Sequence, residues 1–124
     1  MIPAAVFVIA VFAQPPAKAP DVTLMKANLG GSCSADFTVK DSGGKPVYAA
    51  MVHVRVRYGF AGVKRADLEV GTSAEGKARV EGLPDKARLM TWDINKRDGD
   101  VEKKAEVTQD VSSTCHATFD VNLK

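Results

Sequence analysis

Segment 51–58, MVHVRVRY, alternates between valines and polar or basic residues, with every second position apolar. Successive side chains of a β-strand point to opposite faces, so this pattern predicts a strand with one buried and one solvent-facing side. His53, Arg55 and Arg57 lie on the solvent-facing side. No window of the sequence shows a comparable helical period, and the predicted fold class is therefore all-β.

The same period of two returns along most of the chain. Further strands are predicted at 33–41, 64–72, 77–84, 88–94, 101–111 and 115–124, and segment 21–27 would add one more. Short strands separated by Gly, Pro and Asp turns predict a sandwich of two antiparallel sheets, with seven strands or, counting 21–27, eight. Lys103 and Gln109 interrupt the apolar side of the segment 101–111, which predicts an edge strand.

A turn precedes the valine-rich strand. Residues 41–46, DSGGKP, supply two glycines that tolerate positive φ and a proline whose φ is already set. Turns of this composition join antiparallel neighbours in many sheets. We therefore predict that the segments 33–41 and 51–58 form a hairpin.

The two cysteines begin similar segments. CSADFTVKD starts at Cys33 and CHATFDVNLK starts at Cys115, and both contain the pattern C-x-A-x-F-x-V. If the two strands pair in parallel, the cysteines come level, and we predict a disulfide between them. Two buried free thiols are the alternative. A catalytic cysteine is not expected, because the neighbouring His116 faces the opposite side of its strand.

The amino terminus is apolar and uncharged from residue 2 to residue 13, and a Pro-rich stretch follows it. This run is shorter than the about 20 residues that cross a bilayer, but it matches the hydrophobic part of a secretory signal. We predict a signal peptide at 1–13, a Pro/Gly-rich linker at 14–32 and a β-sandwich domain at 33–124. An uncleaved, membrane-inserted tail at 1–13 is the alternative. The predicted location is extracytoplasmic: the periplasm, the cell surface or the medium.

The central motifs resemble those of a known superfamily. FTVKDSGGKPVYAAMVHVRV at 37–56 contains D-x-x-G-x-P-V, and TSAEGKARVEGLP at 72–84 contains T-x-x-x-G and a closing L-P. This arrangement resembles the carboxypeptidase regulatory-like, or transthyretin-like, superfamily and its bacterial immunoglobulin-like relatives. The resemblance implies an Ig-like sandwich that serves as a non-catalytic module of exported proteins. Many relatives carry aspartates where this chain has Ser73, Ala74 and Glu75, which removes the basis for a calcium-type site.

Composition and charge exclude some functions. The 124 residues, 45% hydrophobic and 26% charged, suffice for one domain with one core. A net charge of +2 does not argue for nucleic acid as a partner. His53 and His116 face outward in their predicted strands, so we predict no enzyme and no cofactor. A copper site built from Met51, His53, Cys115 and His116 makes a small-ligand or metal carrier the alternative function.

The loop YGFAGVKR at 58–65 places Phe60 beside Lys64 and Arg65. An exposed aromatic side chain next to basic residues is typical of a contact loop. We predict that these three residues bind a partner, together with the basic side chains of the strand 51–58. The alternative is that Phe60 folds over the core.

Two kinds of partner fit these features. The first is another envelope or extracellular protein, bound by the contact loop or by the edge strand that contains Lys103, where an unpaired backbone accepts another strand. The second is an anionic glycan or a membrane surface, held by His53, Arg55 and Arg57. The sequence leaves the oligomeric state open. The predicted function is an exported, non-catalytic module that mediates protein association or has a structural role in the cell envelope.

Overall fold

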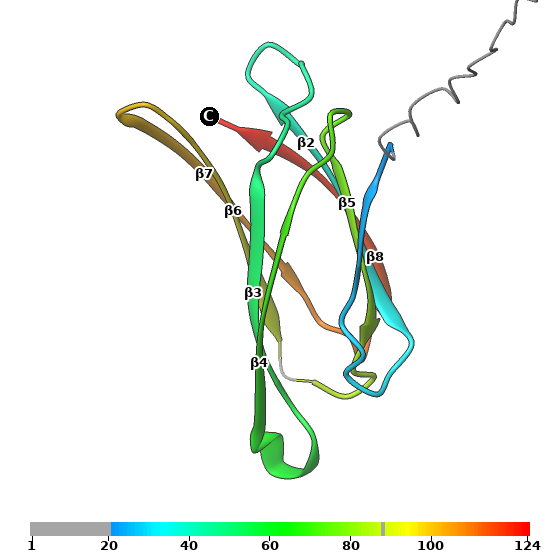
Figure 1. Ribbon diagram of the computed structural model, residues 1–124. Coiled ribbons are helices and arrows are strands. Elements are labelled where there is room, and N and C mark those ends of the chain that lie inside the picture. The colour runs from blue at the N-terminus through cyan, green and yellow to red at the C-terminus, as the bar shows by residue number, and fades with distance from the viewer. Residues whose placement is uncertain (1–20, 88) are drawn as a thin grey trace, which may run out of the picture.

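Two four-stranded β-sheets face each other across one core (Figure 1). A computed structural model describes residues 21–124 except Arg88, so the predictions for residues 1–20 lie outside the described residues. The strands are β1 (Thr23–Lys26), β2 (Cys33–Asp41), β3 (Met51–Tyr58), β4 (Lys64–Gly71), β5 (Lys77–Leu83), β6 (Met90–Asp98), β7 (Val101–Gln109) and β8 (His116–Leu123). Nowhere in the described residues is there a helix with the length and apolar character needed to cross a membrane.

The predicted all-β sandwich is confirmed. Sheet A has the strand order β1-β5-β2-β8, and sheet B has the order β4-β3-β6-β7. Segment 21–27 supplies the eighth strand, β1, which pairs in parallel with β5. The strand that contains Lys103, β7, lies at an edge of sheet B as predicted, and β6 continues further than predicted, to Asp98.

β2 and β8 pair in parallel, and the repeated cysteine motif aligns with itself. The register pairs Ala35 with Ala117, Phe37 with Phe119 and Val39 with Val121. The parallel arrangement predicted from the cysteines is therefore confirmed. Because two of its three strand pairs are parallel, sheet A is mixed, whereas sheet B is antiparallel throughout, so the prediction of antiparallel sheets holds for sheet B only.

The predicted hairpin between segments 33–41 and 51–58 is wrong. The turn itself forms, because the Asp41 carboxylate accepts hydrogen bonds from the backbone N–H groups of Gly43 and Lys45, at 2.8 and 3.0 Å. After this turn the chain crosses to the other sheet, so β2 lies in sheet A and β3 lies in sheet B. Alternation fixes which face of a strand is buried, but it does not distinguish a neighbour in the same sheet from one packed across the core.

Aromatic rings fill the centre of the core. Phe37 of sheet A and Trp92 of sheet B are both buried, and their rings meet edge to face with centroids 4.8 Å apart. Phe119 stacks on Phe37 with centroids 5.3 Å apart. Such ring pairs stabilise a fold beyond the area that they bury, and this one joins the two sheets.

Gln109 has a structural role that the alternating pattern does not reveal. Its side chain is buried, and its carbonyl oxygen accepts a hydrogen bond from Trp92 Nε1 at 3.2 Å. Its amide nitrogen donates to the backbone carbonyls of Ser34 and Thr114, at 3.1 and 3.0 Å. A buried amide is tolerated only when its polar atoms have partners, and these contacts tie the end of β7 to β2 and to the loop before β8.

Candidate functional site

Cys33 and Cys115 form a disulfide, and their Cα atoms lie 4.6 Å apart. The predicted pairing is confirmed, and the alternative of two free thiols is wrong. A carboxylate oxygen of Asp85 lies 3.5 Å from Cys33 Sγ. Among the described residues, these three form the one group whose possible metal-ligand atoms all lie within 4.8 Å of one another. Neither sulfur can act as a thiolate ligand, because both are in the disulfide. The pair is therefore a structural crosslink.

The residues of the hypothetical copper site do not come together. Met51 and His53 lie in β3 of sheet B, whereas His116 begins β8 of sheet A and Cys115 directly precedes it. His116 Nδ1 is 2.8 Å from a serine hydroxyl of β2, and His53 Nε2 is 3.9 Å from a carboxylate oxygen of Asp67. Each imidazole thus has its nearest polar partner on its own sheet, and the geometry does not favour a metal carrier.

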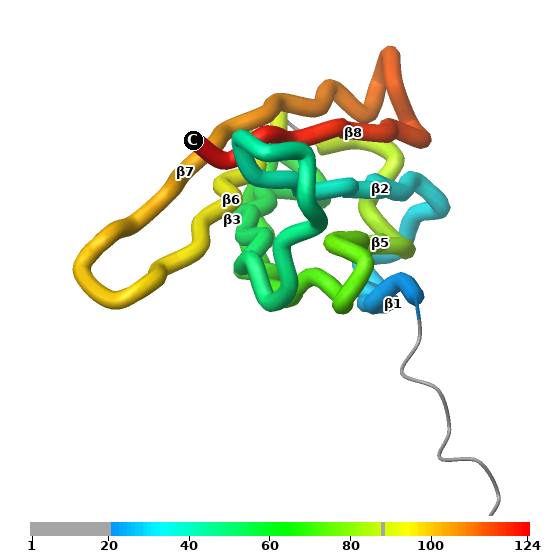
Figure 2. The backbone as a smooth tube through the Cα atoms, turned by 90° about the horizontal axis from the view of Figure 1, so that it is seen from above, coloured from blue at the N-terminus to red at the C-terminus, as the bar shows by residue number. Residues whose placement is uncertain are grey.

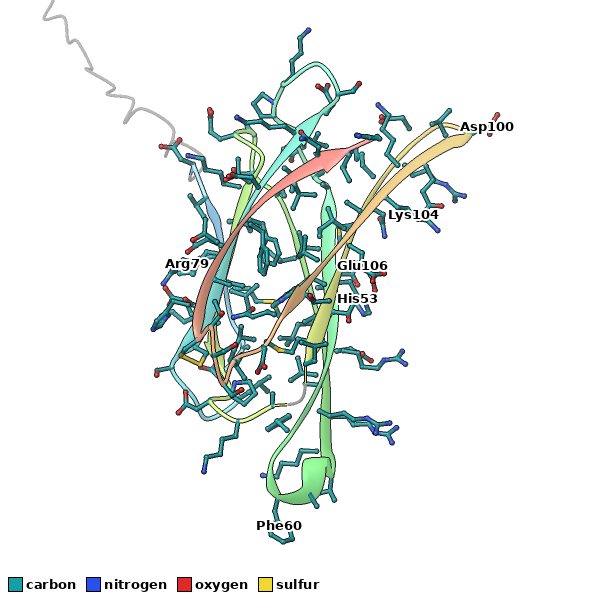
Figure 3. The ribbon with its side chains drawn as sticks, turned by 180° about the vertical axis from the view of Figure 1, so that it is seen from behind. His53, Phe60, Arg79, Asp100, Lys104 and Glu106 are labelled. Carbon is teal, nitrogen blue, oxygen red and sulfur yellow. A yellow bond between two sulfur atoms is a disulfide. The ribbon has the colours of Figure 1, made fainter. Side chains whose placement is uncertain are left out.

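The basic residues of β3 share the outer face of sheet B, whereas Arg79 of β5 lies on the other sheet. Arg55 forms an ion pair with Asp67 at 3.0 Å, and His53 lies beside the same carboxylate on the outer face of sheet B (Figure 3). Arg79 lies on the other side of the sandwich, where two carboxylates of sheet A bind it. These exposed pairs contribute little to stability, and they neutralise bases that a partner would otherwise contact.

Phe60 stands at the tip of the loop between β3 and β4 and points away from the sandwich (Figure 3). Its side chain is 92% exposed, so the alternative in which it folds over the core is wrong. Two backbone hydrogen bonds shape the loop, from Gly62 N–H to the Gly59 carbonyl at 3.1 Å and from Val63 N–H to the Phe60 carbonyl at 3.3 Å. The binding role of Phe60 stays a prediction.

Lys86 is a further base at this end of the molecule, and the sequence did not single it out. Ala87 forms an isolated antiparallel bridge with Tyr58, which brings the segment after β5 against the base of the loop. Lys86, Arg57 and Ser112 help to line a hollow of about 330 Å³ there. A single bridge between distant segments leaves no periodic pattern in the sequence, so the position of Lys86 beside the loop could not be predicted.

At the opposite end, β6 and β7 extend beyond the rest of sheet B (Figures 1 and 2). β3 pairs with β6 only as far as Asn95, so residues 96–98 and 101–103 pair with each other alone. We call these two segments the ribbon. Figure 3 shows Asp100 at the tip of the ribbon and Phe60 at the other end of the molecule. The two surfaces predicted to bind partners are therefore well separated.

Two aspartates at turns have pKa values below their usual range. At Asp41 the backbone N–H of Lys45 is the main cause, and at Asp110 the hydroxyl of Ser112 is. Hydrogen bonds to a carboxylate favour its charged form. Both carboxylates thus serve to hold turns in place.

We expect Asp41 and Asp110 to titrate below 3.8, their ordinary pKa, in an NMR titration of the carboxyl carbons. Because the folded-state pKa is lowered, each group contributes stability that is present above pH 3.8 and lost as the pH falls through the folded-state value. Ser112→Ala should raise the pKa of Asp110 and leave that of Asp41 unchanged. Midpoints at or above the ordinary value in the wild-type protein would contradict these turn hydrogen bonds.

Comparison with known proteins shows a likeness of fold. No family model and no curated protein matches the sequence. Catechol 1,2-dioxygenase from Acinetobacter sp. ADP1 matches with a TM-score of 0.53 and 13% identity, over 83% of this chain and 57% of that one. The enzyme from Pseudomonas arvilla C-1 matches with a TM-score of 0.52 and 14% identity, over 86% and 58%. The shaft pilin SpaA from Lactobacillus rhamnosus GG matches with a TM-score of 0.49 and 14% identity, over 75% and 46%.

The chain spans a little over half of the length of these dioxygenases, 57% and 58%. At such identities the similarity shows the β-sandwich fold and nothing about activity. Membership of the transthyretin-like superfamily stays a prediction from the motifs. The chain is therefore a β-sandwich of two four-stranded sheets, with a disulfide that joins β2 to the residue directly before β8.

Proposed function

We propose that the protein is an exported, non-catalytic β-sandwich module of the cell envelope that associates with another protein by strand addition to β7. Export is supported by the disulfide, which persists in oxidising compartments, and by the apolar segment 2–13. The observation that carries the proposal is the free edge of β7. The structure does not favour the alternative of a metal carrier, because the copper-site residues lie on different sheets.

β7 is nine residues long, and in the described part of the chain only one of its edges has a partner strand. Unpaired N–H and C=O groups along an edge are a template for another strand. In the ribbon, β7 also protrudes from the rest of the sheet, which leaves room for a partner (Figure 2). Each backbone hydrogen bond gained contributes about 1 kcal/mol net, so side-chain contacts with the added strand must supply part of the binding free energy.

The register shows which residues of β7 face the free edge. Thr72 N–H donates to the Ala50 carbonyl at 2.9 Å, so even-numbered residues of β3 bond to β4 and odd-numbered ones bond to β6. The same alternation, carried across β6, directs the odd-numbered residues of β7 toward β6. The backbone groups of Glu102, Lys104 and Glu106 therefore face the free edge.

Lys103 restricts which strand can be added. Its side chain lies on the inward side of β7, half-buried, and helps to line a hollow of about 310 Å³ together with Tyr48 and Lys96. An inward-pointing charge on an edge strand opposes non-specific pairing, because an apolar neighbour would remove its solvent. Asp41 and Asp98 line the same hollow, so an added strand with a polar side chain at the matching position keeps Lys103 solvated or paired.

Lys104→Pro tests strand addition. Proline removes the N–H group that faces the free edge, while the hydrogen bonds between β7 and β6 stay in place. We expect capture of the partner in a crosslinking pull-down from envelope extract to fall by about tenfold, the equivalent of one or two hydrogen bonds. Lys104→Ala is the matched control, since it removes the same side chain and keeps the N–H group. Equal capture by both variants would argue against strand addition at β7.

A further inference from the structure

Arg57 and Arg65 lie directly opposite each other on β3 and β4, next to the loop that carries Phe60. Like charges in this cross-strand position destabilise the pair. The carboxylate nearest in the register, Asp67, is bound by Arg55 at 3.0 Å. Within the described residues neither Arg57 nor Arg65 takes part in an ion pair. This end of the sheet thus holds two guanidinium groups whose neighbouring carboxylate, Asp67, is already paired with Arg55.

Two lysines add to this positive charge. Lys64 lies over the ring of Tyr58, with its Nζ atom 6.0 Å from the ring centroid. Lys86 borders the hollow of about 330 Å³ at the base of the loop, together with Arg57 and Ser112. The described residues that line this hollow include no carboxylate. Guanidinium and ammonium groups are donors that bind phosphate-type anions, whereas the Ser112 hydroxyl already donates to the Asp110 carboxylate at 2.6 Å.

Beyond these bases the tip of the loop is apolar. Phe60 and Val63 are 92% and 72% exposed, and Phe60 is the outermost labelled side chain at this end (Figure 3). Ala61 has a φ of 59°, a left-handed conformation that is unfavourable for a residue with a Cβ atom. The loop adopts this strained conformation, in which the Phe60 side chain points outward. An apolar tip in water and a strained backbone together indicate that the tip has a function.

We propose that this end of the protein docks on the surface of an anionic phospholipid bilayer. Phe60 and Val63 enter the boundary between headgroups and acyl chains, where peripheral proteins bury their apolar side chains. The four bases lie behind the tip, at the depth of the headgroup phosphates, and bind them. The phosphates supply the negative charge that the arginine pair lacks.

A bilayer fits this tip better than an acidic protein does. A side chain as exposed as Phe60 would need a deep pocket in a protein partner, whereas a bilayer accepts a protruding apolar group anywhere on its surface. The bases flank the tip, and a layer of headgroups offers each of them an anion. Because the ribbon lies at the opposite end, a docked molecule presents the edge of β7 away from the membrane (Figure 3).

Vesicle co-sedimentation of the full chain tests this docking. The probes are vesicles of phosphatidylcholine alone and of phosphatidylcholine mixed with phosphatidylglycerol. We expect tighter binding to the anionic vesicles than to phosphatidylcholine alone, where the apolar segment 2–13 also contributes, and a smaller difference between the two as salt is raised. Phe60→Ala should weaken binding by about tenfold or more, and Lys64→Gln and Arg65→Gln by about fivefold each. The apolar segment 2–13 is the same in every variant, so these differences report on the tip.

Tyr48→Ala is the matched control, because Tyr48 is also an exposed aromatic residue but lies at the ribbon end. Tyr48→Ala should leave vesicle binding unchanged, and so should Lys104→Pro. Membrane docking and strand addition to β7 are therefore tested independently of each other. Equal vesicle binding by the wild-type protein and Phe60→Ala would overturn membrane docking. Membrane docking would also be overturned if the protein did not bind vesicles but captured another protein, and if this capture required Phe60. The tip would then be a contact for a protein.

Soluble phosphate distinguishes a lipid surface from a site for free anions. We expect inorganic phosphate to release the protein from anionic vesicles no more than chloride does at the same ionic strength, because both act by screening. A much stronger release by phosphate would show that the hollow beside Lys86 binds the free anion. That result would indicate that the ligand is a soluble anion and not a membrane surface, and it would overturn the docking proposal.

Discussion

A variant without the disulfide should unfold far more readily than the wild-type protein. Cys33 and Cys115 are 82 positions apart in the sequence, and replacing both with alanine frees a loop of that length in the unfolded chain. In the chain-entropy treatment such a crosslink contributes about 4–5 kcal/mol. We expect the melting temperature, measured by calorimetry, to fall by roughly 20 °C or more.

Reductant supplies the control for this result. It should lower the melting temperature of the wild-type protein toward that of the double alanine variant, and it should leave the variant unchanged. Replacing both cysteines avoids an unpaired thiol beside Asp85. If the wild-type protein melts at the same temperature in oxidising and reducing buffer, the crosslink does not stabilise the fold.

Phe37→Ala should destabilise the protein by about 3–5 kcal/mol. Phe37 contacts Trp92 across the core and Phe119 within its own sheet, so its removal leaves a cavity between two sheets that cannot close freely. Urea unfolding measures the loss as a lower midpoint with an unchanged slope.

Phe60→Ala is the matched control for this core substitution, because it deletes the same atoms from an exposed side chain. We expect its stability to lie within about 0.5 kcal/mol of the wild-type value. Similar losses from Phe37→Ala and Phe60→Ala would contradict the positions of the two rings. The same variant then serves in the vesicle experiment with its folding already established.

Local patterns predicted most of the fold, because burial and strand direction leave a signal in neighbouring residues. The valines of β3 predicted its buried face, and the repeat at Cys33 and Cys115 predicted the parallel register of β2 and β8. The composition of the loop around Phe60 predicted its exposure. For the buried face and the loop the signal lies within about ten residues, which is the range that alternation and turn chemistry cover. The register of β2 and β8 was predictable because two distant segments repeat one motif.

Contacts between distant segments were not predictable in this way. Assigning β2 and β3 to one hairpin failed, because a turn of the right chemistry can also lead from one sheet to the other. Gln109 was interpreted only as a sign of an edge, although its amide bridges Trp92 and two backbone carbonyls. Lys86 reaches the loop through one bridge that follows no period. Each of these depends on tertiary neighbours that a single sequence does not display.

Site-specific photocrosslinking tests the central claim, association through the free edge of β7, most directly. A photoreactive residue at position 104 faces the proposed partner strand, and one at position 69 lies on the exposed outer face of β4, away from that edge. In intact cells, the account predicts one light-dependent adduct with a protein from position 104 and none from position 69. No adduct from position 104, or the same adduct from both positions, would contradict it.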